Sequence, residues 1–154
     1  MYITILLPEV IKTEKTIQSK YLKRGVELQI FVPDNLLGNE QLNLLLLNDG
    51  QDTEELALQN TLTSLYSQNK IEPLVVVAIK ASKDRLQEYG VAGIPDFQDR
   101  GSKAQSYTDF IIKELIPFIQ TTVEFPINGK RAFAGYSLGG LTAFDIAWNN
   151  DNYF

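Results

Sequence analysis

The sequence predicts an α/β fold, in which helices cover a mostly parallel β-sheet. Short apolar runs that suit strands buried on both faces alternate with segments whose apolar residues recur at helical spacing. Strands that alternate with helices imply right-handed crossovers and therefore a parallel sheet. The composition agrees, since 44% of the 154 residues are hydrophobic and 21% are charged, as in soluble globular domains. Because the sequence contains no repeat and no linker, we expect residues 1–154 to form a single domain.

The N-terminal part of the chain predicts an antiparallel hairpin. Residues 26–32 alternate between apolar and other side chains with a period near two, which is typical of a strand. An extended segment over residues 16–22 precedes this strand, and Gly25 lies between the two. We therefore expect a hairpin that turns near Gly25 and ends at residues 33–35.

Two short apolar runs, residues 42–47 and 74–79, predict buried strands of a parallel sheet. A helix is expected between them, because apolar residues recur at helical spacing in this part of the chain. These residues are Leu58, Leu62, Leu65 and Tyr66. Asp52 and Glu55 have the spacing of a capping box and predict the start of that helix.

The remaining segments predict a long loop, a strand and two helices. Residues 80–101 carry Gly, Pro, Asp and Arg without periodicity and predict the loop. Residues 103–121 have one apolar face and predict a helix with a kink or restart at Pro117, which lacks an N–H group. A short strand over residues 131–134 and a helix that runs through Ala147 are expected to follow.

Charge and composition exclude several classes of function. The net charge of −5 and the pI near 4.7 argue against nucleic acid as a partner, because phosphate binding needs clustered positive charge. The chain has no cysteine and no histidine, so thiolate and imidazole metal sites are excluded, and so is a histidine base from these residues. No apolar run approaches the roughly 20 residues that span a bilayer. We expect a cytoplasmic protein, although a mature secreted protein would have the same composition.

The sequence Gly135-Tyr136-Ser137-Leu138-Gly139 fits the pattern G-x-S-x-G and lies between a predicted strand and a predicted helix. A tight turn there would expose the serine Oγ, and glycines two residues to either side remove Cβ atoms that would clash. The pattern also arises by chance in chains that contain glycine. Its place at the carboxyl end of a strand, where open α/β sheets bind their ligands, favours a nucleophile.

Several stretches resemble a family of serine esterases with the α/β-hydrolase fold. Residues 44–51 read Leu-Leu-Leu-Leu-Asn-Asp-Gly-Gln, residues 85–90 read Arg-Leu-Gln-Glu-Tyr-Gly, and residues 110–118 form the predicted helix before the nucleophile strand. With residues 134–143, they resemble the family of enterochelin esterase, esterase D, feruloyl esterases and the mycolyltransferases. The likeness spans about residues 44–148. It implies a three-layer α/β-hydrolase fold that is incomplete at its C-terminus.

The resemblance also implies roles for individual residues. Ser137 would be the nucleophile, and the backbone N–H groups of Leu138 and Gln51 would form the oxyanion hole. Asp49 and Gly50 would shape the turn before Gln51. Four further side chains, those of Arg85, Glu88, Tyr89 and Tyr136, would line the site. An ordered loop held by an Arg–Glu pair is an equally good interpretation of residues 85–88.

The sequence departs from this family after the nucleophile. The family's triad acid and histidine follow the nucleophile in the order serine, acid, histidine, and these 154 residues contain neither of those segments. Asp145 and Asp151 follow Ser137, but we expect neither to be the triad acid, because one lies on the helix that leaves the turn and the other in a terminal turn. We therefore expect the chain to be the N-terminal portion of an esterase and to be inactive alone.

The hypothesis for the whole protein is hydrolysis of a carboxylic ester through an acyl intermediate on Ser137. The expected partner is a small-molecule or sugar-linked ester, with no nucleic acid, membrane, cofactor or metal, and a homo-oligomer stays open. One alternative is acyl transfer to a sugar or alcohol on the same fold. A second is a non-catalytic binding domain, because fold does not fix function.

Overall fold

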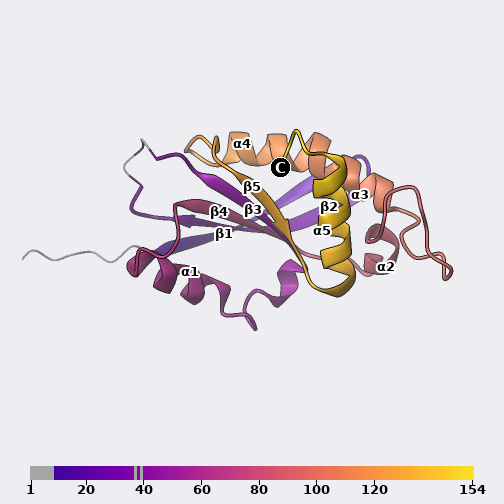
Figure 1. The fold of residues 1–154 in the computed structure, drawn as a ribbon, viewed down its shortest axis with the longest axis horizontal. Helices are drawn as coiled ribbons and strands as arrows, with labels where there is room; N and C mark the ends of the chain where they lie inside the picture. Colours follow the sequence, from indigo (N-terminus) through magenta and orange to yellow (C-terminus); the bar gives the residue numbers. More distant parts are fainter. Residues whose placement is uncertain (1–8, 37, 39) are drawn as a thin grey trace, which may run out of the picture.

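The computed structural model describes residues 9–36, 38 and 40–154, which form a five-stranded mixed sheet with helices (Figure 1). The strand order is β1-β2-β4-β3-β5. The strands are β1 Val10–Ser19, β2 Arg24–Pro33, β3 Asn43–Asn48, β4 Leu74–Ile79 and β5 Arg131–Ala134. The helical segments are η1 Gly50–Asp52, α1 Leu58–Ser67, α2 Arg85–Glu88, α3 Ala104–Phe110, η2 Ile111–Leu115, α4 Ile116–Thr122 and α5 Ser137–Asn149.

Strands β1 and β2 pair antiparallel along their whole length, from Val10 opposite Pro33 to Ser19 opposite Arg24. The turn that joins them occupies residues 20–23, just before the predicted position near Gly25. β1 also begins well before the expected segment at residue 16. β1 is an edge strand with mostly exposed side chains. Its residues 12–16 are all polar and therefore lack the apolar period that would reveal a strand.

The centre of the sheet is built from the two apolar runs. β3 pairs in parallel with β4 on one side and with β5 on the other. Both runs are strands as predicted, and their side chains are mostly buried on both faces of the sheet. β2 pairs with β4 antiparallel, so the sheet as a whole is mixed.

Helix α1 covers one face of the sheet and begins later than predicted (Figure 1). The chain turns at Ala57, whose φ is 47°, and no side-chain cap bonds the first turn of α1. The capping box expected at Asp52 and Glu55 is therefore wrong. Asp52 ends the short helix η1, which follows β3 directly. Tyr66 of α1 packs into the core on this face.

The opposite face carries a long helical stretch over residues 104–122, close to the predicted 103–121. Its middle part, η2, is a π-helical turn, and α4 begins at Ile116 with Pro117 in its first turn. Because proline has no N–H for the i−4 carbonyl, a wider turn here accommodates the missing bond. The restart predicted at Pro117 thus takes the form of a π-turn just before it.

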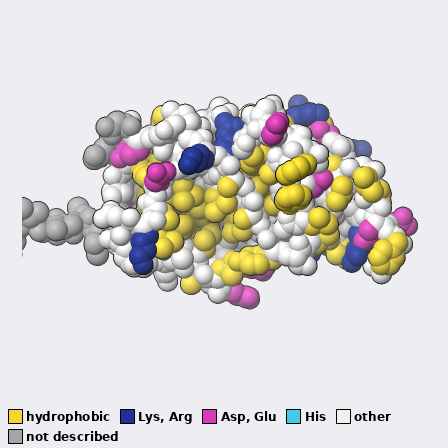
Figure 2. Space-filling view, in the orientation of Figure 1, with side chains coloured by type: hydrophobic (Ala, Val, Ile, Leu, Met, Phe, Trp, Pro, Cys, Tyr) yellow, Lys and Arg dark blue, Asp and Glu magenta, His cyan; other side chains and the backbone are white. Residues whose placement is uncertain are grey.

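Helix α5 lies over the β5 side of the sheet and leaves apolar side chains at the surface (Figure 2). Leu141, Phe144 and Trp148 are all exposed, and the Phe144 and Trp148 rings stack with centroids 5.6 Å apart. Across the residues that the structure describes, no helix is both long enough and apolar enough to cross a membrane.

Candidate active site

The turn between β5 and α5 holds Ser137 in a conformation that is unusual for an L-residue. Its φ is 47°, in the left-handed region, whereas the preceding Tyr136 is extended with φ −109° and ψ 147°. A non-glycine residue in this region costs about 1–2 kcal/mol. Ser137 is also exposed at the surface. The turn therefore exposes Ser137 to solvent, and the backbone of Ser137 is strained in this position.

Three glycines allow this turn to pack closely, but their φ angles lie outside the left-handed region. A Cβ on Gly135 would lie 2.5 Å from the carbonyl carbon of Gly139. A Cβ on Gly140 would lie 2.9 Å from the carbonyl oxygen of Gly135. A Cβ on Gly139 would lie 2.7 Å from Asp49 Oδ2, which belongs to a different turn. The glycines are therefore required by close approach of backbone to backbone and to Asp49.

The second turn of the site follows β3 and is fixed by an ion pair. Asp49 has a φ of 60°, and its buried carboxylate accepts hydrogen bonds from Arg85 Nε at 2.6 Å and Nη2 at 2.9 Å. This hydrogen bonding raises the pKa of Arg85, against the effect of partial burial. The Gln51 side chain donates to Asp49 Oδ1 at 3.3 Å and accepts from the N–H of Ala81 at 3.0 Å. Gln51 is thus anchored to the ends of both β3 and β4.

Tyr89 supports this turn through contacts with both Asp49 and Arg85. Its ring is 1% exposed, and its hydroxyl accepts a hydrogen bond from the N–H of Asp49 at 3.3 Å. The Arg85 guanidinium carbon lies 4.9 Å from the Tyr89 ring centroid, within range of a cation–π contact. Burial, reinforced by the charge of Asp49, raises the pKa of Tyr89 to about 12. Tyr89 is therefore a neutral structural group at physiological pH.

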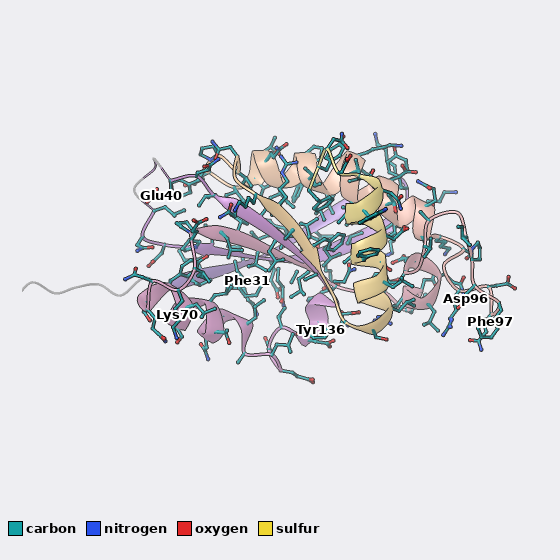
Figure 3. The ribbon with its side chains drawn as sticks, viewed as in Figure 1. Phe31, Glu40, Lys70, Asp96, Phe97 and Tyr136 are labelled. Atoms are coloured by element: carbon teal, nitrogen blue, oxygen red, sulfur yellow. The ribbon has the colours of Figure 1, made fainter. Side chains whose placement is uncertain are left out.

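The two turns line the same open cleft, which has a volume of about 470 Å³. Ser137 and Tyr136 line it from the β5–α5 turn, and Gln51 and Arg85 line it from the side of β3 and α2. The other lining residues are Asp49, Asp52, Glu55 and Leu56. Tyr136 lies at this end of α5, away from the loop that carries Asp96 and Phe97 (Figure 3). Leu138 is in the first turn of α5, where backbone N–H groups lack acceptors within the helix.

Glu88 and Tyr89, which were expected to line the site, lie outside the cleft. Both side chains are buried, at 2% and 1% exposure, and neither belongs to the lining of the cleft. Glu88 pairs instead with Arg24 of β2, whose Nε and Nη2 donate to its carboxylate at 2.8 and 2.6 Å. The alternative of an ordered loop held by an Arg–Glu pair thus has Arg24 as the arginine, since Arg85 bonds Asp49. Sequence reasoning missed Arg24 because it lies far from Glu88 in the chain.

The two aspartates that follow Ser137 have structural surroundings. Asp145 is buried; its Oδ2 accepts from the N–H of Ala92 at 3.0 Å and its Oδ1 from Asn149 Nδ2 at 2.9 Å. It therefore anchors the loop after α2 to α5. Asp151 is exposed in the turn that follows α5. Within the described part of the chain, no group of three or more Asp, Glu, His or Cys side chains is arranged to hold a metal ion.

The family described as "Putative esterase" matches residues 19–154. The uncharacterized protein YjcH of Bacillus subtilis (strain 168) is 27% identical over 147 residues. That alignment covers 92% of this chain but 57% of YjcH, so the chain spans little more than half of this curated relative.

Solved structures share the fold. An IroE-like serine hydrolase from Shewanella oneidensis superposes with a TM-score of 0.74 at 26% identity, covering 94% of this chain and 48% of that one. The enterobactin esterase FES from Shigella flexneri superposes with a TM-score of 0.77 at 23% identity, covering 96% and 36%. The five-stranded mixed sheet with helices is therefore an α/β-hydrolase-like fold.

Proposed function

The chain belongs to the "Putative esterase" family, and from this premise we propose that the protein hydrolyses carboxylic esters through an acyl intermediate on Ser137. One observation carries the proposal. Ser137 is exposed in a cleft, in a left-handed conformation, at the N-terminus of a helix. Such a turn presents a nucleophile and places backbone N–H groups where negative charge develops.

In the proposed reaction, Ser137 Oγ attacks the ester carbonyl carbon while a general base takes the hydroxyl proton. The carbonyl oxygen becomes an oxyanion, which accepts hydrogen bonds from the backbone N–H groups of Leu138 and Gln51. Collapse of the tetrahedral intermediate expels the alcohol, which receives the proton from the base. Water then attacks the acyl-serine by the same steps in reverse, and the acid is released.

The base is proposed to come from outside these 154 residues, which contain no histidine. Asp49, which lines the cleft, is engaged by Arg85. Tyr89 lies beneath the same turn and, with its pKa at about 12, holds its proton too tightly to act near neutral pH. An unactivated serine is a poor nucleophile at neutral pH. The 154-residue chain is therefore expected to be nearly inactive alone.

Hydrolysis of p-nitrophenyl acetate tests this proposal. The full-length protein is expected to release nitrophenolate, its Ser137→Ala variant to fall to the buffer rate, and the 154-residue chain to stay near that rate. Robust serine-dependent turnover by the 154 residues would overturn the need for an outside base. Equal rates for the full-length protein and its Ser137→Ala variant would overturn the esterase function itself.

Two further features support the whole-protein proposal. Helix α1 lies on one face of the sheet, and α3, α4 and α5 lie on the other (Figure 1), as a three-layer α/β-hydrolase architecture requires. The cleft is open and presents the exposed Tyr136 and Leu56 beside polar groups, which suits a small-molecule or sugar-linked ester.

A further inference from the structure

Asn48, the last residue of β3, connects the two turns of the site directly. Its side chain is 1% exposed, and its Nδ2 donates to the carbonyl oxygen of Gly139 at 2.8 Å. Its Oδ1 accepts a hydrogen bond from the Tyr107 hydroxyl at 2.6 Å. Gly139 lies two residues after Ser137, and Asn48 lies three residues before Gln51. The Asn48 amide is thus a bridge between the strand end that carries Gln51 and the helix turn that carries Leu138.

The chemistry of its partners fixes the orientation of this amide. The carbonyl oxygen of Gly139 can only accept a hydrogen bond, so the NH₂ group of Asn48 must face it. The Asn48 oxygen then faces Tyr107, and the Tyr107 hydroxyl must be the donor. Burial raises the pKa of Tyr107 well above its ordinary value, so the hydroxyl keeps its proton across the physiological range.

Tyr107 is itself held in place by the ring of Tyr89, which supports Asp49, the residue after Asn48. It lies on α3, is 1% exposed, and meets the Tyr89 ring edge-on with centroids 5.2 Å apart. Tyr89 in turn accepts the hydrogen bond from the N–H of Asp49. The two tyrosines therefore support the end of β3 as one buried unit, Tyr89 at Asp49 and Tyr107 at Asn48, and Asn48 passes this support on to Gly139.

We propose that Asn48, oriented by Tyr107, is a positioning residue that fixes the distance between the two amides of the oxyanion hole; this inference rests on the proposed function. The amide of Leu138 belongs to α5 and the amide of Gln51 to the turn after β3. Asn48 bonds one of these elements and belongs to the other. A hole of two donors stabilises the oxyanion only if both are in place before the reaction.

The first variant is Tyr107→Phe in the full-length protein. It removes the hydroxyl and leaves the ring packing, so the Asn48 amide loses the contact that orients it. We expect kcat for p-nitrophenyl acetate to fall by about 10-fold and KM to change little, because loss of a whole oxyanion donor costs on the order of 10²–10³-fold. A merely structural role would not produce a selective loss of kcat in folded protein.

A matched control lies on the opposite face of the sheet. Tyr66 of α1 is also buried; its hydroxyl donates to the carbonyl oxygen of Leu74 at 2.9 Å and accepts from the N–H of Leu74 at 3.1 Å. Tyr66→Phe removes the same kind of bond away from the cleft. It is expected to lower the melting temperature by an amount similar to Tyr107→Phe and to leave kcat unchanged.

The second variant, Asn48→Asp, is nearly isosteric but turns a carboxylate oxygen toward the carbonyl oxygen of Gly139. Where it folds, kcat is expected to fall further than in Tyr107→Phe, by about 100-fold. The inference is overturned if Tyr107→Phe, folded and as stable as Tyr66→Phe, keeps the kcat of the wild type. If the wild type itself shows no turnover that depends on Ser137, the proposed function fails and this inference fails with it.

Discussion

Because the backbone at Ser137 is strained, the Ser137→Gly variant should be more stable than the Ser137→Ala variant. This order is the reverse of the one found at ordinary helix positions. Ser137 is the first residue of α5, but its φ of 47° is one that glycine adopts freely. Both replacements remove the hydroxyl, so their difference in stability reports the backbone.

The magnitude follows from two opposing effects. Release of the left-handed strain favours glycine by about 1–2 kcal/mol. The greater flexibility of glycine in the unfolded chain favours alanine by about 0.5–1 kcal/mol. Ser137→Gly should therefore be more stable than Ser137→Ala by about 0.5–1 kcal/mol. For a chain of this length, that difference corresponds to a melting temperature higher by about 1–4 °C.

Thermal denaturation followed by circular dichroism measures this difference, and Ser64 provides the control. Ser64 lies exposed in the middle of α1, and its φ lies outside the left-handed region. There, glycine should be less stable than alanine by about 1 kcal/mol. If glycine is the less stable replacement at both positions, Ser137 is not strained and the reasoning about the turn is wrong.

Three further predictions concern other parts of the molecule. Gly139→Ala should destabilise the protein by about 1–3 kcal/mol in urea denaturation, because the new Cβ would lie 2.7 Å from Asp49 Oδ2; an unchanged midpoint would show that the turns are not in contact. Tyr89→Phe should flatten the alkaline loss of stability. The folded pKa of Tyr89 is raised to about 12, so the stability that this residue contributes is fully present below the unfolded pKa near 10 and is lost as the pH rises toward 12. An equal slope of stability against pH in the wild type and in Tyr89→Phe would contradict this. In the 154-residue chain, whose single tryptophan is Trp148, this side chain is 74% exposed and should emit at long wavelength and be quenched by iodide, whereas shielded, short-wavelength emission would show that the outer face of α5 is covered.

The parts of the fold that the sequence predicted well are those in which local pattern and burial agree. The strand at residues 74–79 is apolar throughout because both of its faces are buried, and its predicted bounds match β4. The turn at Ser137 follows from local spacing of glycines between a strand and a helix. The polar residues 12–16 of β1 and the false capping box at Asp52 and Glu55 show where local pattern misleads, since the edge position and the turn at Ala57 are set by tertiary packing.

The supporting residues of the site could not be predicted, because they depend on contacts between distant parts of the chain. Asp49 and Arg85 are 36 positions apart in the chain, with β4 between them, and nothing near either residue identifies its partner. The hydrogen bond from Tyr107 to Asn48 spans 59 positions. Tyr89, part of the resemblance to esterases, lies buried beneath Asp49 and outside the cleft.

The most direct test of the account is covalent labelling of the full-length protein with a fluorophosphonate probe, followed by mapping of the modified peptide. A nucleophilic serine attacks the phosphorus, displaces fluoride and keeps the phosphonyl group, so the label identifies the reacting residue. The account predicts a single label on Ser137 that disappears in Ser137→Ala. A folded protein that leaves Ser137 unlabelled, or that labels equally well after Ser137→Ala, would contradict the assignment of Ser137 as the nucleophile.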